Sequence, residues 1–221
     1  MKNIFNFLLI LFISVSVLFA QKPYVEYWHN GQKATEGTLS DKGVRIGAWH
    51  WYYENGALQK VGEYNDKGLK VGEWKDYYAD GKLQKQEIFS GKGECKAFYE
   101  NGQLQYAYNV VDGLKQGEYN EYYADGKKKI QATYKDNALD GYAIWYFSDG
   151  KKDMEGYLKM GKRDGNWTYY YRSNGQKGSE GAYSNDKEIG RWIYYYETSE
   201  KWREGDYRNG IRNGTRWMAI N

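Results

Sequence analysis

Hydrophobic residues follow two different patterns along this chain. Residues 4–19 are almost entirely apolar, without alternation. From residue 22 onward the chain shows short runs in which aromatic and polar residues mix, such as GAWHWYYENG from Gly47 to Gly56. Short runs rich in aromatic, β-forming residues and bounded by turn residues favour β-strands over helices. The pattern therefore predicts an all-β protein that follows a short apolar leader.

The interruptions between the aromatic runs have the composition of tight turns. Asn-Gly and Asp-Gly are the strongest short-range hairpin signal, because both central residues of a type I′ turn need positive φ. We therefore expect each pair to close a β-hairpin of this turn type. The pairs are Asn30-Gly31, Asn55-Gly56, Asp80-Gly81, Asn101-Gly102, Asp125-Gly126, Asp149-Gly150 and Asn174-Gly175, with Thr198-Ser199 in the corresponding place of a later run.

A second glycine opens each aromatic run and recurs every 21 to 25 residues. These opening glycines are Gly47, Gly72, Gly93, Gly117, Gly141, Gly165, Gly190 and Gly214. About eight related units, including a first one without its opening glycine, fill residues 21–221 with no linker between them. An isolated hairpin is marginally stable in water, so each must bury apolar side chains against its neighbours. We predict an elongated repeat array of antiparallel β-hairpins that forms a single twisted sheet.

The aromatic residues of a unit fall at fixed positions, counted here from its opening glycine. The fifth and sixth positions are aromatic in each of the seven units that open at Gly47 to Gly190, as in Tyr52 and Tyr53. Adjacent strand residues point to opposite faces, so we expect one aromatic ladder on each face of the sheet. The second position is mostly aromatic, with Cys95 and Ala143 as exceptions. We interpret all three positions as architecture, in which ring contacts hold the units together.

The fourth position differs because it also accepts charge. It holds Asp76 and Glu121 in two units, which predicts that this position is at least partly exposed. Exposed rings on a fixed sheet suit sugar faces, peptide side chains or lipid headgroups. The alternative is that these rings only extend the packing. The candidate binding residues are Trp51, Trp145, Tyr169 and Tyr194.

The unit also resembles a known family. The pattern GxWxYYYxNGxxxxEGxY, as in Gly165 to Tyr183 and Gly47 to Tyr64, is similar to the MORN repeat, in the variant form that occurs as arrays in bacterial proteins, including those labelled YwqK-like antitoxins. The resemblance implies a sheet of successive hairpins that serves as a scaffold or interaction module, sometimes near membranes. An antitoxin role fits an exported chain poorly, because such toxins usually act in the cytoplasm. The unit is also weakly similar to the choline-binding repeats of cell-wall proteins. It differs from them in its longer period and in ending with Gly-x-Tyr.

The apolar leader has the three parts of a secretory signal peptide. Lys2 gives it a basic start, Ile4 to Phe19 form the apolar stretch, and Ala20 offers a small residue for cleavage before Gln21. Sixteen helical residues span about 24 Å, which is short of a hydrocarbon core of about 30 Å. We therefore expect residues 1–20 to direct export to the periplasm or the outside of the cell. Attachment to the cell surface is compatible with this expectation.

Charge and cysteine content narrow the range of partners. A net charge of +3 does not predict nucleic-acid binding, and the lone Cys95 allows no intramolecular disulfide. Basic residues recur in the turns between units, where acidic residues accompany them, so we interpret them as a solvated fringe that protects the sheet edge. An anionic polymer or a membrane surface is the alternative partner of this fringe. The basic residues are Arg45, Lys70, Lys92, Lys115, Arg163, Lys187 and Arg212.

Catalytic chemistry finds little support in the sequence. His29 and His50 occupy different positions of the unit, and no nucleophile has a spacing tied to them. Cys95 replaces a ring at the second position, so we expect a small packed residue and not a reactive thiol. No metal or cofactor motif is present in the sequence. We predict an exported, non-enzymatic scaffold for a protein partner or cell-envelope component, with a cell-wall glycan-binding module as the alternative. The oligomeric state is left open.

Overall fold

The computed structural model describes the backbone of residues 21–219 and the side chains of residues 21–213. The predicted signal peptide, residues 1–20, lies outside the described residues. Within the described part, the chain forms strands and turns and contains no helix. The strands are β1 (Lys22–Tyr27), β2 (Lys33–Leu39), β3 (Arg45–Tyr52), β4 (Leu58–Tyr64), β5 (Lys70–Tyr77), β6 (Leu83–Ile88), β7 (Lys92–Phe98), β8 (Leu104–Val111), β9 (Leu114–Tyr122), β10 (Lys128–Lys135), β11 (Ala138–Leu139), β12 (Gly141–Tyr146), β13 (Lys152–Lys159), β14 (Lys162–Tyr170), β15 (Lys177–Ser184), β16 (Lys187–Tyr195), β17 (Lys201–Arg208) and β18 (Ile211–Ala219).

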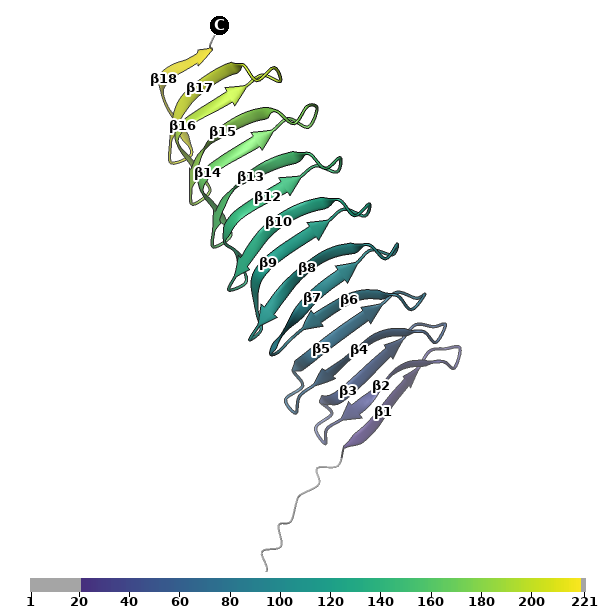
Figure 1. The fold of residues 1–221 in the computed structure, drawn as a ribbon. Coiled ribbons are helices and arrows are strands. Elements are labelled where there is room, and N and C mark those ends of the chain that lie inside the picture. The colour runs from purple at the N-terminus through teal and green to yellow at the C-terminus, as the bar shows by residue number, and fades with distance from the viewer. Residues whose placement is uncertain (1–20, 220–221) are drawn as a thin grey trace, which may run out of the picture.

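The strands form one open antiparallel sheet in sequence order. Each strand pairs with the next along the chain, and the short β11 together with β12 occupies a single place beside β10. Figure 1 shows the hairpins stacked one after another into an elongated ribbon, with their turns along its two long edges. The predicted all-β repeat array with a single sheet is confirmed.

The turns at the Asn-Gly and Asp-Gly pairs are not of the predicted type I′. In the turn between β3 and β4, Gly56 has a φ of +82°, whereas Asn55 has no positive φ. Gly56 N donates to Tyr53 O at 2.9 Å, Tyr53 N donates to Ala57 O at 2.8 Å, and Asn55 Oδ1 accepts from Ala57 N at 3.0 Å. This is a type I turn followed by a glycine bulge, in which asparagine acts through its side chain. The Asn-Gly and Asp-Gly pairs therefore predicted the positions of the hairpin turns correctly, but the turn conformation differs from the predicted one.

Two-residue turns with both φ values positive occur at the other edge, between successive hairpins. Asp136 and Asn137, with φ of 50° and 71°, join β10 to β11. Asn185 and Asp186 do the same between β15 and β16. The two edges therefore use different turns in the second half of the array, whereas the β2–β3 and β4–β5 turns, closed by Gly43 N to Ser40 O and Gly68 N to Asn65 O, resemble the Asn-Gly turns.

The opening glycine makes a bulge that bends each hairpin against the preceding one. Between β2 and β3, Glu36 pairs with His50 and Thr38 pairs with Ile46. The three residues 47–49 of β3 therefore lie opposite a single residue of β2, Gly37. Gly47, with a φ of +64°, is the first of these three residues. Gly72, Gly117, Gly141, Gly165 and Gly190 are left-handed as well, whereas Gly93 is not, so the recurrence of the glycine follows from the bulge in all of these units but that of Gly93.

The bulge places the second-position tryptophan flat over a glycine of the preceding strand. A Cβ added to Gly37 would lie 2.3 Å from Trp49 Cδ2, and one added to Gly62 would lie 2.1 Å from Trp74 Cδ2. Trp49 is fully buried, and its indole Nε1 donates to Thr38 O at 3.2 Å. The same packing joins Gly156 to Trp167 and Gly181 to Trp192. The contact removes the largest apolar ring of each unit from water while its N–H stays satisfied.

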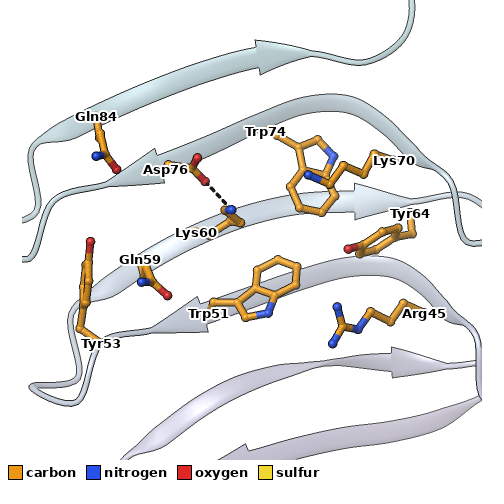
Figure 2. A pocket seen from close by; sticks show the side chains of 10 residues that line it. All are labelled: Arg45, Trp51, Tyr53, Gln59, Lys60, Tyr64, Lys70, Trp74, Asp76 and Gln84. Carbon is orange, nitrogen blue, oxygen red and sulfur yellow. Dashed lines mark ion pairs between the residues drawn. The ribbon is translucent and has the colours of Figure 1, made fainter. Parts of the chain in front are cut away.

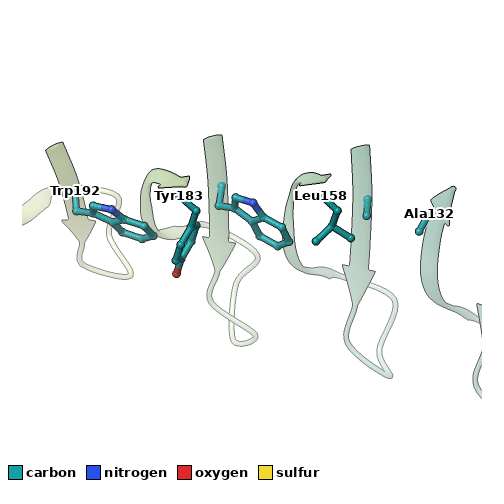
Figure 3. Packing of buried hydrophobic residues seen from close by; sticks show 6 residues of the cluster. Ala132, Leu158, Tyr183 and Trp192 are labelled. Carbon is teal, nitrogen blue, oxygen red and sulfur yellow. The ribbon is translucent and has the colours of Figure 1, made fainter. Parts of the chain in front are cut away.

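The middle of the array fills the same space with other residues. Ala132 and Ala143, exposed by 5% and 1%, take the places of the glycine and the tryptophan there. Figure 3 shows the resulting row, which runs from Trp192 and Tyr183 past Leu158 to Ala132. Cys95 is buried in the hairpin before this region, and its Sγ accepts from Ile88 N at 3.2 Å. Its predicted role as a small packed residue is confirmed.

Sixth-position side chains tie one hairpin to the next by hydrogen bonds. The hydroxyl of Tyr53 donates to Tyr77 O at 2.7 Å, and that of Tyr171 donates to Tyr195 O at 2.6 Å. Tyr78, Tyr99 and Tyr123 repeat this bond to the fifth-position carbonyl of the next unit. The sixth position thus links the units through its hydroxyls, where the sequence had predicted ring contacts.

Candidate functional site

The four predicted binding residues all lie on the face that carries the second-position tryptophans, called the aromatic face from here on. Each is half-buried, which agrees with the partial exposure predicted for the fourth position. The ring of Trp51 lies 6.0 Å from that of Trp49 and 5.6 Å from that of Trp74. Trp145 lies 5.5 Å from Trp167, and Tyr169 and Tyr194 each lie 6.3 Å from Trp192. The fourth position therefore forms a second aromatic row beside the buried one.

These four residues do not form a single site. Trp145, Tyr169 and Tyr194 lie on β12, β14 and β16, which belong to three successive hairpins. Trp51 lies on β3, near the other end of the array (Figure 1). The aromatic face thus presents two separate regions in which a ligand could contact fourth-position rings.

A groove of about 360 Å³ lies around Trp51, over strands β3 to β6. Trp51 and Trp74 form its floor, Arg45, Tyr64 and Lys70 lie at one end, and Gln59 and Gln84 lie towards the other (Figure 2). Lys60 Nζ pairs with Asp76 Oδ1 across the groove at 3.3 Å. The groove combines flat rings, amides and an excess of positive charge.

Two cations of this groove lie over its rings. The Arg45 guanidinium is 4.7 Å from the ring centroid of Trp49 and 5.7 Å from that of Trp51. Lys70 Nζ is 4.2 Å from the centroid of Trp74. A cation at this distance over an aromatic face is attracted by about 0.5–1 kcal/mol at exposed sites. Both residues remain exposed to solvent, so a ligand can reach their charges.

Arg45 and Lys70 are solvated, as interpreted from the sequence, but several edge cations also lie over aromatic rings. Lys115 Nζ also lies over rings, 4.5 Å from the centroid of Tyr108, and Arg163 lies 4.0 Å from that of Tyr183. Arg45, Lys70, Lys115 and Arg163 each stand two residues before an opening glycine, next to the bulge. Their side chains fold back onto the aromatic face.

The corresponding region around Tyr169 is closed by polar contacts. Arg163 Nη1 donates to Tyr169 Oη at 3.1 Å, and the hydroxyls of Tyr169 and Tyr183 share a hydrogen bond of 3.0 Å. Arg163 Nε also pairs with Asp186 Oδ1 at 3.1 Å. Burial, followed by the hydrogen bond with Tyr169, raises the pKa of Tyr183. Charge and hydroxyls in this region are satisfied within the protein.

Fifth-position tyrosines lie on the opposite face, as expected from strand alternation, and three of them, Tyr52, Tyr170 and Tyr195, donate to carboxylates. Tyr52 Oη donates to Glu36 Oε1 at 2.5 Å, and Tyr195 Oη donates to Glu180 Oε1 at 2.5 Å. Burial and the bond to Glu36 raise the pKa of Tyr52 to about 12. Hydrogen bonds from Lys33 and Tyr52 lower the pKa of Glu36. These networks join neighbouring strands and leave no reactive group free.

No catalytic constellation is found among the described side chains. His29 lies 3.9 Å from Glu54 at an exposed position, and the His50 ring stacks on that of Tyr52 at 6.4 Å. Burial raises the pKa of the Cys95 thiol, which disfavours the thiolate. In the same part of the chain, no group of three or more His, Cys, Asp and Glu residues is placed to hold a metal ion.

Sequence reasoning named Arg45 and Lys70 only as part of the basic edge, without their contacts to the rings, and missed Tyr64. The signal that could have found the two cations is their fixed distance from the opening glycine. The signal for Tyr64 is the Gly-x-Tyr that ends each unit, because a residue two places after Gly62 lies on the same face as the ring covering that glycine. Tyr64 indeed contacts Trp74, with ring centroids 5.0 Å apart.

Comparison with known proteins supports the repeat assignment. None of the described residues belongs to a helix long and apolar enough to cross a membrane. No curated protein matches the chain by sequence. Four successive segments, residues 45–66, 70–90, 92–112 and 115–136, match the family model of the MORN repeat variant, so the part of the array that carries the groove is built of repeats similar to that family.

Proposed function

We propose that the chain is an exported, non-enzymatic repeat scaffold that binds a protein partner or a cell-envelope component through its aromatic face. The observation that carries this proposal is the difference between the second and fourth positions of the unit on that face. Among the described side chains of the units with an opening glycine, the second position is buried except at Tyr119, and it supports the fold. The fourth position varies from Trp51 to Asp76, Glu121 and Trp145 while the hairpin stays the same. A half-exposed position that the fold does not constrain is available for recognition.

Photo-crosslinking tests which face binds. A crosslinking residue replaces Trp51 or Trp145 on the aromatic face, and matched variants carry it at His50 or Ile144, the neighbouring residues on the opposite face. We expect the same protein or envelope component to be captured from the aromatic face and not from the opposite one. Equal capture from both faces, or none from either, would contradict the scaffold proposal.

A cell-wall glycan is the second candidate for the ligand, in the region of Trp145. Fourth-position rings follow one another there on three successive hairpins, Trp145, Tyr169 and Tyr194, so their spacing is about 10 Å from the width of two strands. A row of rings at this spacing suits a linear sugar chain. Retention on purified peptidoglycan that is abolished in W145A/Y169A would favour the glycan over a protein partner.

Export is part of the same proposal and has its own test. The basic start, apolar stretch and small residue before Gln21 support removal of residues 1–20. We expect the exported protein to begin near Gln21, as determined by N-terminal sequencing of the chain recovered outside the cytoplasm. Recovery of the full-length chain from the cytoplasm alone would exclude export.

A further inference from the structure

The groove over β3 to β6 contains two cations, Arg45 and Lys70, that form no ion pair with the side chains that the structure describes. Lys60 in the same groove, by contrast, pairs with Asp76 at 3.3 Å. Both cations lie over tryptophan rings that hold them in place. Because the rings already restrict both side chains, binding a ligand costs less side-chain conformational entropy.

We propose that this groove binds an extended, acidic segment of a partner protein, whose carboxylates pair with Arg45 and Lys70. This inference rests on the scaffold function proposed above and names the chemistry of its ligand. Arg45 can receive a carboxylate through two parallel hydrogen bonds, and Lys70 acts as a point charge. Trp51, half-buried beside Arg45 and Trp74, offers an apolar surface to the rest of the segment.

The spacing of the cations sets the spacing of the acidic residues. Arg45 and Lys70 occupy equivalent places in successive hairpins, which puts their backbones about 10 Å apart across two strands. A chain in the polyproline II conformation presents residues i and i+3 on one side at a separation of about 9 Å. A segment that runs across the strands with an acidic residue at every third position therefore matches both cations.

The same contacts disfavour a neutral sugar in this groove. Sugars stack on open aromatic faces, but Arg45 and Lys70 already cover the ring faces of Trp49 and Trp74, and both rings are buried. The amides of Gln59 and Gln84, also one hairpin apart, lie towards the other end of the groove (Figure 2). Amides can donate to and accept from a peptide main chain, so they suit a protein segment.

The test uses a labelled peptide with the sequence Glu-Pro-Pro repeated five times, and its Gln-Pro-Pro analogue, with binding measured by fluorescence anisotropy. We expect the acidic peptide to bind at least tenfold more tightly than the analogue, and more weakly as salt rises. R45Q/K70Q is expected to lose at least tenfold in affinity. R45K/K70R keeps both charges and should retain most of the binding.

The matched control is K42Q/K67Q, which removes two charges from exposed turn lysines of the same hairpins, also one repeat apart. This variant should bind the acidic peptide as the wild type does. Equal losses in R45Q/K70Q and K42Q/K67Q would show a non-specific charge effect and overturn the proposal. Equal binding of the two peptides would overturn it as well.

Two further ligands test whether the groove prefers an acidic glycan or an anionic lipid surface to an acidic peptide. An oligomer of galacturonic acid and vesicles that contain phosphatidylglycerol are tested against the same variants. Tighter binding of either one than of the acidic peptide, with the same loss in R45Q/K70Q, would assign the groove to a glycan or a lipid surface and overturn the peptide proposal. If R45Q/K70Q still captures the crosslinked partner and the peptide does not bind, the scaffold function stands and the acidic ligand is wrong.

Discussion

The hairpins β3–β6 and β14–β17 share one packing scheme and differ in the chemistry that they present. In both regions a tryptophan covers a glycine, as Trp74 covers Gly62 and Trp192 covers Gly181. At the positions of Trp51, Tyr64 and Lys70 in the first region, the second region carries Tyr169, Tyr183 and Glu188. The core contact is therefore constant, while the positions around it decide what each region can bind.

Arg45 and Arg163 show the difference most directly, because they occupy the same place in their hairpins. Arg163 is neutralised by Asp186 at 3.1 Å and also donates to Tyr169, which in turn bonds to Tyr183. Arg45 lies over Trp49 and Trp51 and forms no such pair among the described residues. The first region is open to an anion, whereas the second is closed by its own polar groups.

The shared tryptophan–glycine contact should give the largest effect on stability. We expect W74A to cost about 3–5 kcal/mol, since it removes a buried ring. G62A should cost about 1–3 kcal/mol, because the new methyl would lie 2.1 Å from Trp74 Cδ2. The double variant should cost less than the sum, because the methyl then has room, as the natural Ala132 and Ala143 show.

Chemical denaturation followed by circular dichroism measures this cycle, and the same cycle at Gly181 and Trp192 tests whether the two regions share it. G178A is the matched control: its new Cβ would lie 3.5 Å from Tyr171, which is ordinary contact. This control should change the unfolding midpoint little. Additive costs in both regions would show that ring and glycine are not coupled.

Acid should separate the two regions next. Hydrogen bonds from Tyr195 and Lys177 lower the pKa of Glu180, and bonds from Lys152 and Tyr170 lower that of Glu155 despite its partial burial, which opposes them. A carboxyl with a lower pKa in the folded chain stabilises it above the ordinary value of about 4.5, and this stability is lost as the pH falls through the folded-state pKa. Val61 and Gln86 stand at the corresponding places of the first region and do not titrate.

Hydrogen exchange read by mass spectrometry at pH 6 and pH 3 measures this difference region by region. We expect protection of β14–β16 and of the adjacent β13, which carries Glu155, to fall by roughly 2 kcal/mol more than that of β4–β6, since the bonds to two carboxylates, Glu155 and Glu180, are weakened. E155Q/E180Q should remove most of the extra pH dependence. A uniform loss of protection along the array would contradict the role of these carboxylates.

The hydroxyl pair of the second region should give a smaller effect. Y183F removes the bond between Tyr183 and Tyr169, so we expect a cost of about 0.5–1.5 kcal/mol. The matched change in the first region is Y64F, where the ring contacts with Trp49 and Trp74 are retained. Y64F should shift the unfolding midpoint little. Equal costs for the two variants would show that the hydroxyl pair does not distinguish the regions.

The strands, the turn positions and the two faces of the array could be predicted because they depend on local alternation. A two-residue period places Tyr52 and Tyr53 on opposite faces wherever the strand is regular. The packing of the tryptophans could not be predicted, because it depends on the bulge at Gly47 and on a glycine of the preceding strand. Pairing register between repeats is not written in the spacing of a single repeat.

The fourth-position candidates were placed correctly on a half-buried row, but their partners were not predicted. Trp51 contributes to a groove because Arg45 and Lys70 fold over the sheet, and the direction of a long side chain at the first residue of a strand, just before a bulge, does not follow from sequence alone. The turn type was also wrong, because Asn-Gly suits two different hairpin geometries. In this chain asparagine caps the turn through its side chain, and glycine alone takes the left-handed conformation.

The smallest expected effect concerns the hairpin turns of the two regions. The β5–β6 turn has Gly81 in the left-handed conformation, with a φ of +85°, whereas the β16–β17 turn has Ser199 there, with a φ of +71°. A left-handed backbone costs an L-residue about 1–2 kcal/mol. Replacing that residue by glycine relieves this strain, but glycine loses more conformational entropy on folding, which offsets part of the relief.

We expect S199G to stabilise the array by about 0.5 kcal/mol, because relief of this strain exceeds the entropy of glycine and the loss of the 2.9 Å bond from Ser199 Oγ to Gln176 Oε1. The reciprocal G81S should destabilise by about 1 kcal/mol. Thermal unfolding of both variants measures the pair. If S199G lowered the midpoint, the side-chain bond to Gln176 would matter more than the backbone conformation, and the serine would be a stabilising feature of the second region.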